Sequence, residues 1–223
     1  MKHAIRLSSL LAAALIVGCA GGHDSAVAPP PATGLAYANP ATTSADWSLV
    51  KDASSTGIHL VLDLVGPSDG TKYRGVGFTL QADTSLVEYA RFQDAKGNPA
   101  GYYTDGGVFR DVFSTLYNTA PTDLPPTLQA SGISNGQLMV GIFQKTDDET
   151  WTAANAGVDG STAKACGRTV LQVALDFDPA AGAAPQTVAL AVVKARVIPE
   201  HVDTYANRMP VPVPIKVGTL TLQ

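Results

Sequence analysis

Short apolar runs that alternate with polar residues at a period of two constrain this chain more than any other feature of its sequence. In residues 58–64, Ile58 and three leucines occupy every second position, and the same spacing recurs in residues 76–82 and 171–177. Successive side chains of an extended strand point to opposite sides of a sheet. Each run therefore predicts a strand with one buried and one polar face.

The sequence predicts about nine strands and no amphipathic helix. Parallel strands need long crossovers, usually helical, and the spacing of the runs leaves no room for them. The predicted fold class is therefore all-β, an antiparallel jelly-roll-like sandwich. The other expected strands cover residues 47–51, 86–93, 108–113, 137–145, 188–198 and 215–222. In the last of these the apolar residues move from odd-numbered positions before Gly218 to even-numbered positions after it, which predicts a bulge.

The N-terminal residues 1–18 have the pattern of a secretion signal, with two basic residues before an apolar run over residues 7–17. A helix needs about 20 apolar residues to cross a bilayer, so this run is too short. The run ends in IVGC, residues 16–19, which resembles the lipobox of bacterial lipoproteins. The resemblance implies that residues 1–18 are removed and that Cys19, the new first residue, carries the lipid.

A lipid on Cys19 would attach the chain stably to a membrane, because several buried acyl chains are hard to extract. Ala20 follows where inner-membrane lipoproteins of this class carry Asp, so the resemblance implies the outer membrane of the cell envelope. The alternative is an ordinary secretion signal in which Cys19 has no role.

The segment that follows reads as a tether, because Ala, Gly and Pro dominate it and no hydrophobic period appears. Three consecutive prolines at residues 29–31 favour an extended backbone. The predicted organisation is a signal peptide over residues 1–18, a lipidated tether over residues 19–37 and one sandwich domain over residues 38–223.

Charge and cysteine content narrow the class of partner. The chain carries a formal charge of -4, and removal of residues 1–18 would take away two basic residues and leave 13 basic against 19 acidic ones. An acidic chain is a poor ligand for nucleic acid.

Cys166 would be the remaining cysteine, so no intramolecular disulfide is expected. It is either buried, which is the more frequent case for a free cysteine, or available for intermolecular pairing.

Residues 74–92, RGVGFTLQADTSLVEYARF, resemble the cohesin pattern of two strands joined by a short turn. Downstream, GQLMVGIF and TVLQVALDFD fall where cohesin-like domains place a central strand and an alternating apolar strand, so the likeness covers about residues 57–198. Cohesins and related carbohydrate-binding modules are nine-stranded jelly-roll sandwiches. The resemblance implies that fold and a non-catalytic binding role, but the recognition residues of the family vary and none is carried over.

No arrangement of residues in the sequence predicts an enzyme. His23, His59 and His201 are scattered and lack the spacing of a zinc site, so each is expected to be solvent-exposed. A G-x-S-x-G motif is missing, and the S-x-x-K match at residues 161–164 lies in a Gly- and Ala-rich loop instead of a helix. Hydrolytic catalysis is therefore the least supported function.

Acidic side chains give weak candidates for a structural calcium ion, and no other cofactor is expected. Asp147, Asp148 and Glu149 form the densest acidic run, and Asp176 and Asp178 are expected to project from one strand face. Calcium needs six to eight oxygen ligands, and no EF-hand loop is present. A solvated turn is the more frequent outcome for such residues.

Aromatic residues on loops are the better candidates for ligand binding. Tyr102 and Tyr103 lie in a glycine-flanked loop, and Trp151 follows the acidic run. Flat rings can stack on sugars or anchor a protein, although they more often cover the ends of a sandwich core. The sequence thus favours a protein-interaction module for an unknown envelope protein, with a surface carbohydrate-binding module that recognises a glycan as the alternative.

Overall fold

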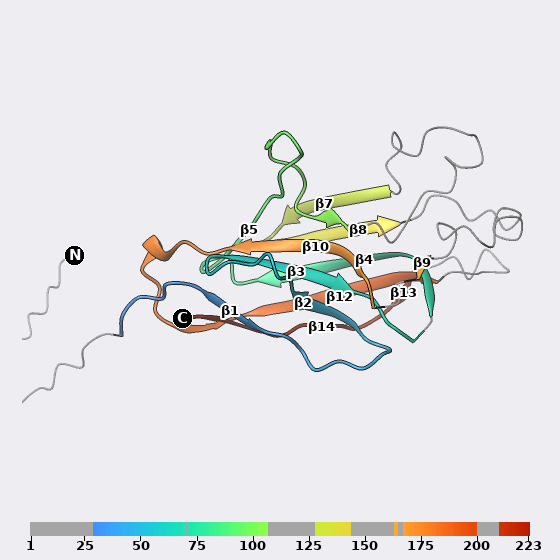
Figure 1. The fold of residues 1–223 in the computed structure, drawn as a ribbon, viewed down its shortest axis with the longest axis horizontal. Helices are drawn as coiled ribbons and strands as arrows, with labels where there is room; N and C mark the ends of the chain where they lie inside the picture. The colour runs from blue at the N-terminus through green and yellow to red at the C-terminus, as the bar shows by residue number, and fades with distance from the viewer. Residues whose placement is uncertain (1–28, 70, 107–127, 144–162, 165–166, 200–209) are drawn as a thin grey trace, which may run out of the picture.

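The computed structural model describes residues 29–69, 71–106, 128–143, 163–164, 167–199 and 210–223. These residues form two six-stranded sheets that pack face to face and a third, three-stranded sheet (Figure 1). The helical element among them is one short 3-10 turn, η1 (Pro179–Ala181). No helix in this part of the chain is long and apolar enough to cross a membrane.

The first large sheet has the strand order β14-β2-β3-β10-β5, and β6 also pairs with β10. Its neighbours are antiparallel except β14 and β2, which run parallel. The antiparallel sandwich predicted from the sequence is confirmed apart from this short pair. The bounds are β2 (Trp47–Lys51), β3 (His59–Val65), β5 (Glu88–Tyr89), β6 (Thr104–Asp105), β10 (Thr169–Asp176) and β14 (Ile215–Lys216).

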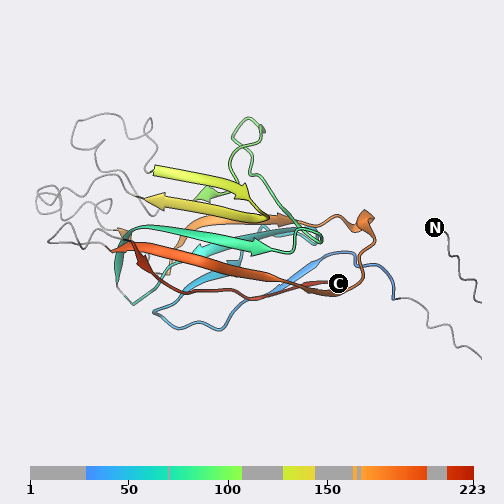
Figure 2. The ribbon, with the colours of Figure 1, turned by 180° about the vertical axis from the view of Figure 1, so that it is seen from behind.

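The second large sheet has the order β13-β12-β4-β8-β7, and β9 pairs with β4. All of its pairings are antiparallel, and Figure 2 shows these strands in front when the molecule is seen from behind. The bounds are β4 (Lys72–Ala82), β7 (Leu128–Ser134), β8 (Gln137–Phe143), β9 (Ala163–Lys164), β12 (Leu190–Pro199) and β13 (Val211–Pro212).

The third sheet joins the two ends of the described chain, in the order β1-β15-β11. Its strands are β1 (Leu35–Ala38), β11 (Gln186–Val188) and β15 (Thr219–Leu222). β1 thus begins before residue 38, the predicted start of the sandwich domain, and Ala32 is already buried in the core. The sequence missed β1 because its four residues, LAYA, resemble the tether in composition and find their partner at the far end of the chain.

The predicted alternation of buried and polar faces is confirmed in the long strands. Leu60, Leu62 and Leu64 of β3 are at most 2% exposed, and Leu80 of β4 and Leu138 of β8 are completely buried. All belong to one core cluster between the sheets. Burying each leucine side chain contributes about 1.5–3 kcal/mol, so this layer is the main source of stability.

The shift of the apolar positions at Gly218 marks the point where the chain passes from one sheet to another, and not the predicted bulge. β14 before it pairs with β2 in the first large sheet, whereas β15 after it pairs with β1 in the third. A Cβ at Gly218 would lie 1.9 Å from the carbonyl oxygen of Ala38, so the crossing requires glycine.

Two buried tyrosine hydroxyls connect segments that belong to different sheets. The Tyr37 hydroxyl donates to the Leu49 carbonyl at 2.9 Å and accepts from the Gly218 N–H at 2.6 Å. The Tyr89 hydroxyl of β5 accepts from the Ala82 N–H of β4 at 2.9 Å. Burial raises the pKa of both phenols, and the backbone N–H donors partly offset it.

The other differences from the predicted strands have local causes. Of the strand expected over residues 86–93, only Glu88–Tyr89 forms, because Ala90 and Phe92 turn onto the outer face of the first sheet and cover Val61. The strand expected over residues 188–198 divides between β11 and β12, and the described residues contain fifteen strand segments, several of only two residues, where about nine strands were expected. The strand predicted at residues 108–113 lies outside the described residues.

Tyr37→Phe tests whether the Tyr37 hydroxyl stabilises the passage of the chain between sheets at Gly218. The change leaves the Leu49 carbonyl and the Gly218 N–H without their partner, which costs about 1–3 kcal/mol of the free energy of unfolding. Urea denaturation monitored by circular dichroism measures the loss. Tyr102→Phe is the control, with an expected change below about 0.5 kcal/mol, and equal effects of the two variants would contradict the assignment.

Candidate functional site

The outer face of the second large sheet contains a groove whose floor is made by glycines. The side chains of Phe78 and Val140 point into the core, so the adjacent residues, Gly77 of β4 and Gly141 of β8, face outward. The two glycines are paired directly opposite one another. Because glycine has no side chain, the sheet surface is low at this point. The groove has a volume of about 540 Å³. We call this surface the glycine face.

Residues on either side of the glycines give the groove its walls. Met139 on β8 is 48% exposed and lies opposite Gly132 of the edge strand β7. Its flexible thioether side chain can adapt to more than one apolar surface. On the other side, Lys194 and Arg196 of β12 are exposed and pair in register with Thr79 and Gly77.

The charge of the glycine face is opposite in sign to that of the whole chain. Lys194 and Arg196 are the charged residues that line the groove in the described part of the chain, and both are basic. No strand of this sheet contains Asp or Glu, although the chain has a formal charge of -4. The groove is therefore apolar at its floor and positive along one wall.

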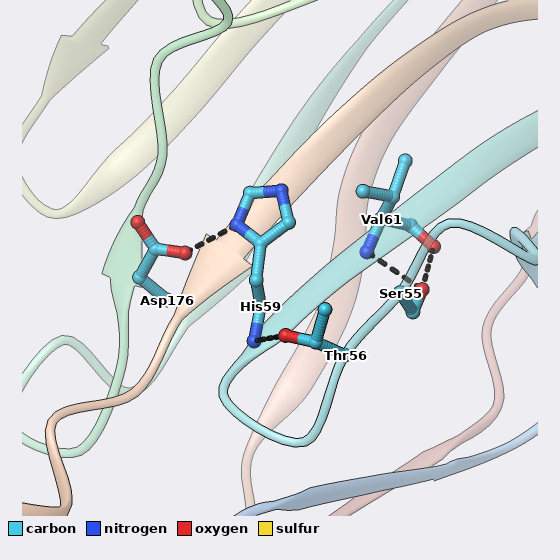
Figure 3. Close-up of polar contacts among 5 residues, drawn as sticks. All are labelled: Ser55, Thr56, His59, Val61 and Asp176. Atoms are coloured by element: carbon cyan, nitrogen blue, oxygen red, sulfur yellow. Dashed lines mark hydrogen bonds and ion pairs between the residues drawn. The ribbon is translucent and has the colours of Figure 1, made fainter.

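The outer face of the first large sheet is acidic and carries a histidine–aspartate pair. The His59 Nδ1 and Asp176 Oδ1 atoms lie 2.5 Å apart, and Figure 3 shows the ring directed toward Asp176. The expected polar face of β3 is confirmed, but the His59 side chain is only 38% exposed because this pair holds it against the sheet. Glu88 of β5 lies opposite Asp176 on the other side.

Among the described residues, the Ser55 and Thr56 hydroxyls near His59 are not arranged as nucleophiles. Ser55 donates to the Val61 carbonyl at 3.1 Å and accepts from its N–H at 3.0 Å, and Thr56 accepts from the backbone N–H of His59 at 3.1 Å. Both hydroxyls serve the turn before β3, away from the ring (Figure 3). A serine–histidine relay needs a hydrogen bond between the two side chains, and these residues do not make one.

Asp63 adds to the acidic character of this face. It accepts a hydrogen bond from the Gln172 Nε2 atom at 2.8 Å. Burial, and next the charge of nearby Asp52, raise the pKa of Asp63, whereas hydrogen bonds from Ser54 lower the pKa of Asp52. The two outer faces of the sandwich thus differ in sign.

The structure places Tyr102 and Tyr103, two of the predicted ligand-binding residues, at the edge between the two large sheets. Both are half-buried against the core. The Arg91 guanidinium lies over the Tyr102 ring at 4.5 Å, and the Tyr102 N–H donates to the Ser131 hydroxyl of β7 at 3.4 Å. Burial raises the pKa of Tyr103, with a further contribution from Asp105. Trp151 lies outside the described residues.

Asp176 and Asp178 are the acidic candidates for calcium that lie within the described residues. The Asp178 Oδ1 atom caps η1 by accepting from the Ala180 N–H at 2.9 Å, and Asp178 lines one pocket together with Asp176 and Glu88. No group of three potential metal ligands occurs among the residues that the structure describes. Asp147, Asp148 and Glu149 lie outside them.

The glycine face was missed in the sequence, although a signal for it is present. Gly75 and Gly77 alternate with buried residues of β4, and Gly141 does so in β8. Glycine at outward positions of two neighbouring strands indicates a low surface. The pairing of Gly77 with Gly141 could not be predicted, because β4 and β8 are far apart in the chain.

No protein-family model and no curated relative matches this chain. Several solved structures are similar to it, among them cohesin domains, the family that residues 74–92 resemble. A type II cohesin from the cellulosome of Acetivibrio cellulolyticus has a TM-score of 0.48 and 12% identity, covering 78% of this chain and 93% of that one.

Two further cohesins have comparable scores. The seventh ScaB type I cohesin of Pseudobacteroides cellulosolvens has a TM-score of 0.44 and 8% identity, with 78% of this chain and 87% of that one covered. The Coh-OlpC–Doc435 complex of Clostridium thermocellum, a cohesin–dockerin complex, has a TM-score of 0.45 and 10% identity over 81% of this chain and 96% of that one. Likenesses at this level fix neither a family nor a partner for this chain.

Proposed function

We propose that this chain is a lipid-anchored protein of the cell envelope whose sandwich is a non-catalytic module that binds another protein on the glycine face. The groove over Gly77 and Gly141 is the observation that carries the proposal. A sheet face with a low apolar floor can receive a protruding element of a partner, because side chains do not hold the two backbones apart.

The walls of the groove define the chemistry of the partner. Met139 offers adaptable apolar area, so the partner should present apolar side chains to it. Lys194 and Arg196 favour carboxylates at the margin, since complementary charge accelerates encounter and excludes partners of the wrong sign. The proposed partner is therefore a protein segment with an apolar centre and an acidic flank.

A carbohydrate ligand is less consistent with the described surfaces. Sugar recognition commonly uses an exposed aromatic ring as a flat platform. Phe78, which is the aromatic residue lining the groove in the described chain, turns inward and is 4% exposed. Tyr102 and Tyr103 pack against the core, and Arg91 covers the Tyr102 ring.

Arg196→Glu tests the docking surface. The full chain, extracted from envelopes in mild detergent, is used to capture a partner, which is then identified and purified for affinity measurements. Reversal of one charge at the margin should weaken binding at least about tenfold, through lost attraction and new repulsion of the acidic flank.

Lys51→Glu supplies the matched control for Arg196→Glu, because it makes the same change of sign on an exposed residue of the first sheet. It should leave the affinity for the partner within about twofold. Equal loss in both variants would show that overall charge matters and not the glycine face.

Cys19→Ala tests the anchor independently of the partner. Cells fed radiolabelled palmitate should label the wild-type chain but not the variant, because the thiol is the atom that receives the lipid. The wild-type chain should also fractionate with membranes, since acyl chains contribute roughly 0.8 kcal/mol per buried methylene. Labelling of the variant, or its retention in the membrane fraction, would contradict lipid anchoring through this residue.

A further inference from the structure

The edges of the three sheets differ in how well they are protected. The edge strands β5, β13 and β14 have two residues each. Pro212 lies within β13, Pro210 precedes it, and Pro214 directly precedes β14. The third sheet ends in β1 and β11, of four and three residues. Short strands and prolines are the usual means by which proteins prevent pairing at a sheet edge.

β7 is the exception among the described edges. It has seven residues, LQASGIS, without a proline or a charged residue, and it pairs with β8 along its whole length without a register shift. Among the described residues, no backbone hydrogen bond joins β7 to any segment other than β8. A side-chain hydrogen bond also reaches β7, because the Ser131 hydroxyl accepts from the Tyr102 N–H. Within the described part of the chain, the outer backbone groups of β7 thus have no backbone partner and form an edge that a further strand could extend.

We propose that β7 pairs with β7 of a second copy of this chain, antiparallel and about a twofold axis at Ser131. About this axis Ser131 faces its own copy, and residues 130 and 132 face each other, so a charge close to the axis would lie near the same charge of the second copy. β7 has none, in a chain that is acidic as a whole. Ile133, which is 44% exposed, would gain cover from the second copy.

This pairing joins two glycine faces into one surface. Ser131 and Gly132 of β7 already line the groove, so the two grooves would meet across the new strand pair. In the proposed register, Ala130 of one copy lies opposite Gly132 of the other, which keeps the junction low. The dimer would present two docking sites side by side, and a partner with two binding elements would gain affinity from their linkage.

Gly132→Lys and Gly132→Gln test the self-pairing. A Cβ at Gly132 meets no atom within 4 Å, so both variants should keep the fold, which circular dichroism verifies. Lysine places two like charges close together across the twofold axis, whereas glutamine adds a similar volume without charge. Light scattering of the full chain in mild detergent, at up to roughly 0.1 mM, measures the protein mass.

The wild-type chain and Gly132→Gln should have the mass of a dimer, and Gly132→Lys should associate at least about tenfold more weakly. Micelles affect all three chains equally. In a Cys166→Ala background, Ser131→Cys should form a disulfide between copies, whereas Thr79→Cys, two strands away, should not. A monomeric wild-type chain, equal association of Gly132→Lys and wild type, or no disulfide at residue 131 would overturn the proposal.

Discussion

The layer of alternate apolar side chains between the two large sheets is the constraint on which the rest of the structure depends. Leu62, Leu64, Leu138 and Leu171 are completely buried in it, and neither sheet could bury these residues alone. Because the period of a strand is two, fixing the inner face also fixes the outer one. The outward position of Gly77 and Gly141 is thus a direct consequence of burying Phe78 and Val140.

The outer faces can then diverge, since packing does not constrain them. The strands of the second sheet contain no acidic residue, while those of the first carry Asp63, Glu88, Asp105 and Asp176. A partner with an acidic flank that fits the basic groove would be repelled by the acidic face. The difference in charge would therefore determine on which face the partner binds, as well as how tightly. The histidine–aspartate pair belongs to the acidic face, and the Ser55 and Thr56 hydroxyls near it bind backbone groups of the turn.

Most of the fold could be predicted because alternation is a local signal. β2 forms over the predicted residues 47–51, and the buried faces of β3, β4 and β10 are those that the spacing indicates. The missed parts depend on distant segments: β1 pairs with β15, and the crossing at Gly218 is held by Tyr37. Tyr102 and Tyr103 are half-buried at the sheet edge, a packing that depends on distant residues, and their role in ligand binding stays a prediction.

The central claim is that a protein partner binds the glycine face, and hydrogen–deuterium exchange with the captured partner tests it most directly. The account predicts slower exchange in peptides from β4, β8 and β12 when the partner is added, because docking excludes water from that sheet. Peptides from β3 and β10 in the first sheet should exchange at unchanged rates. Protection confined to residues 90–105, with no change in β4 and β8, would contradict the account.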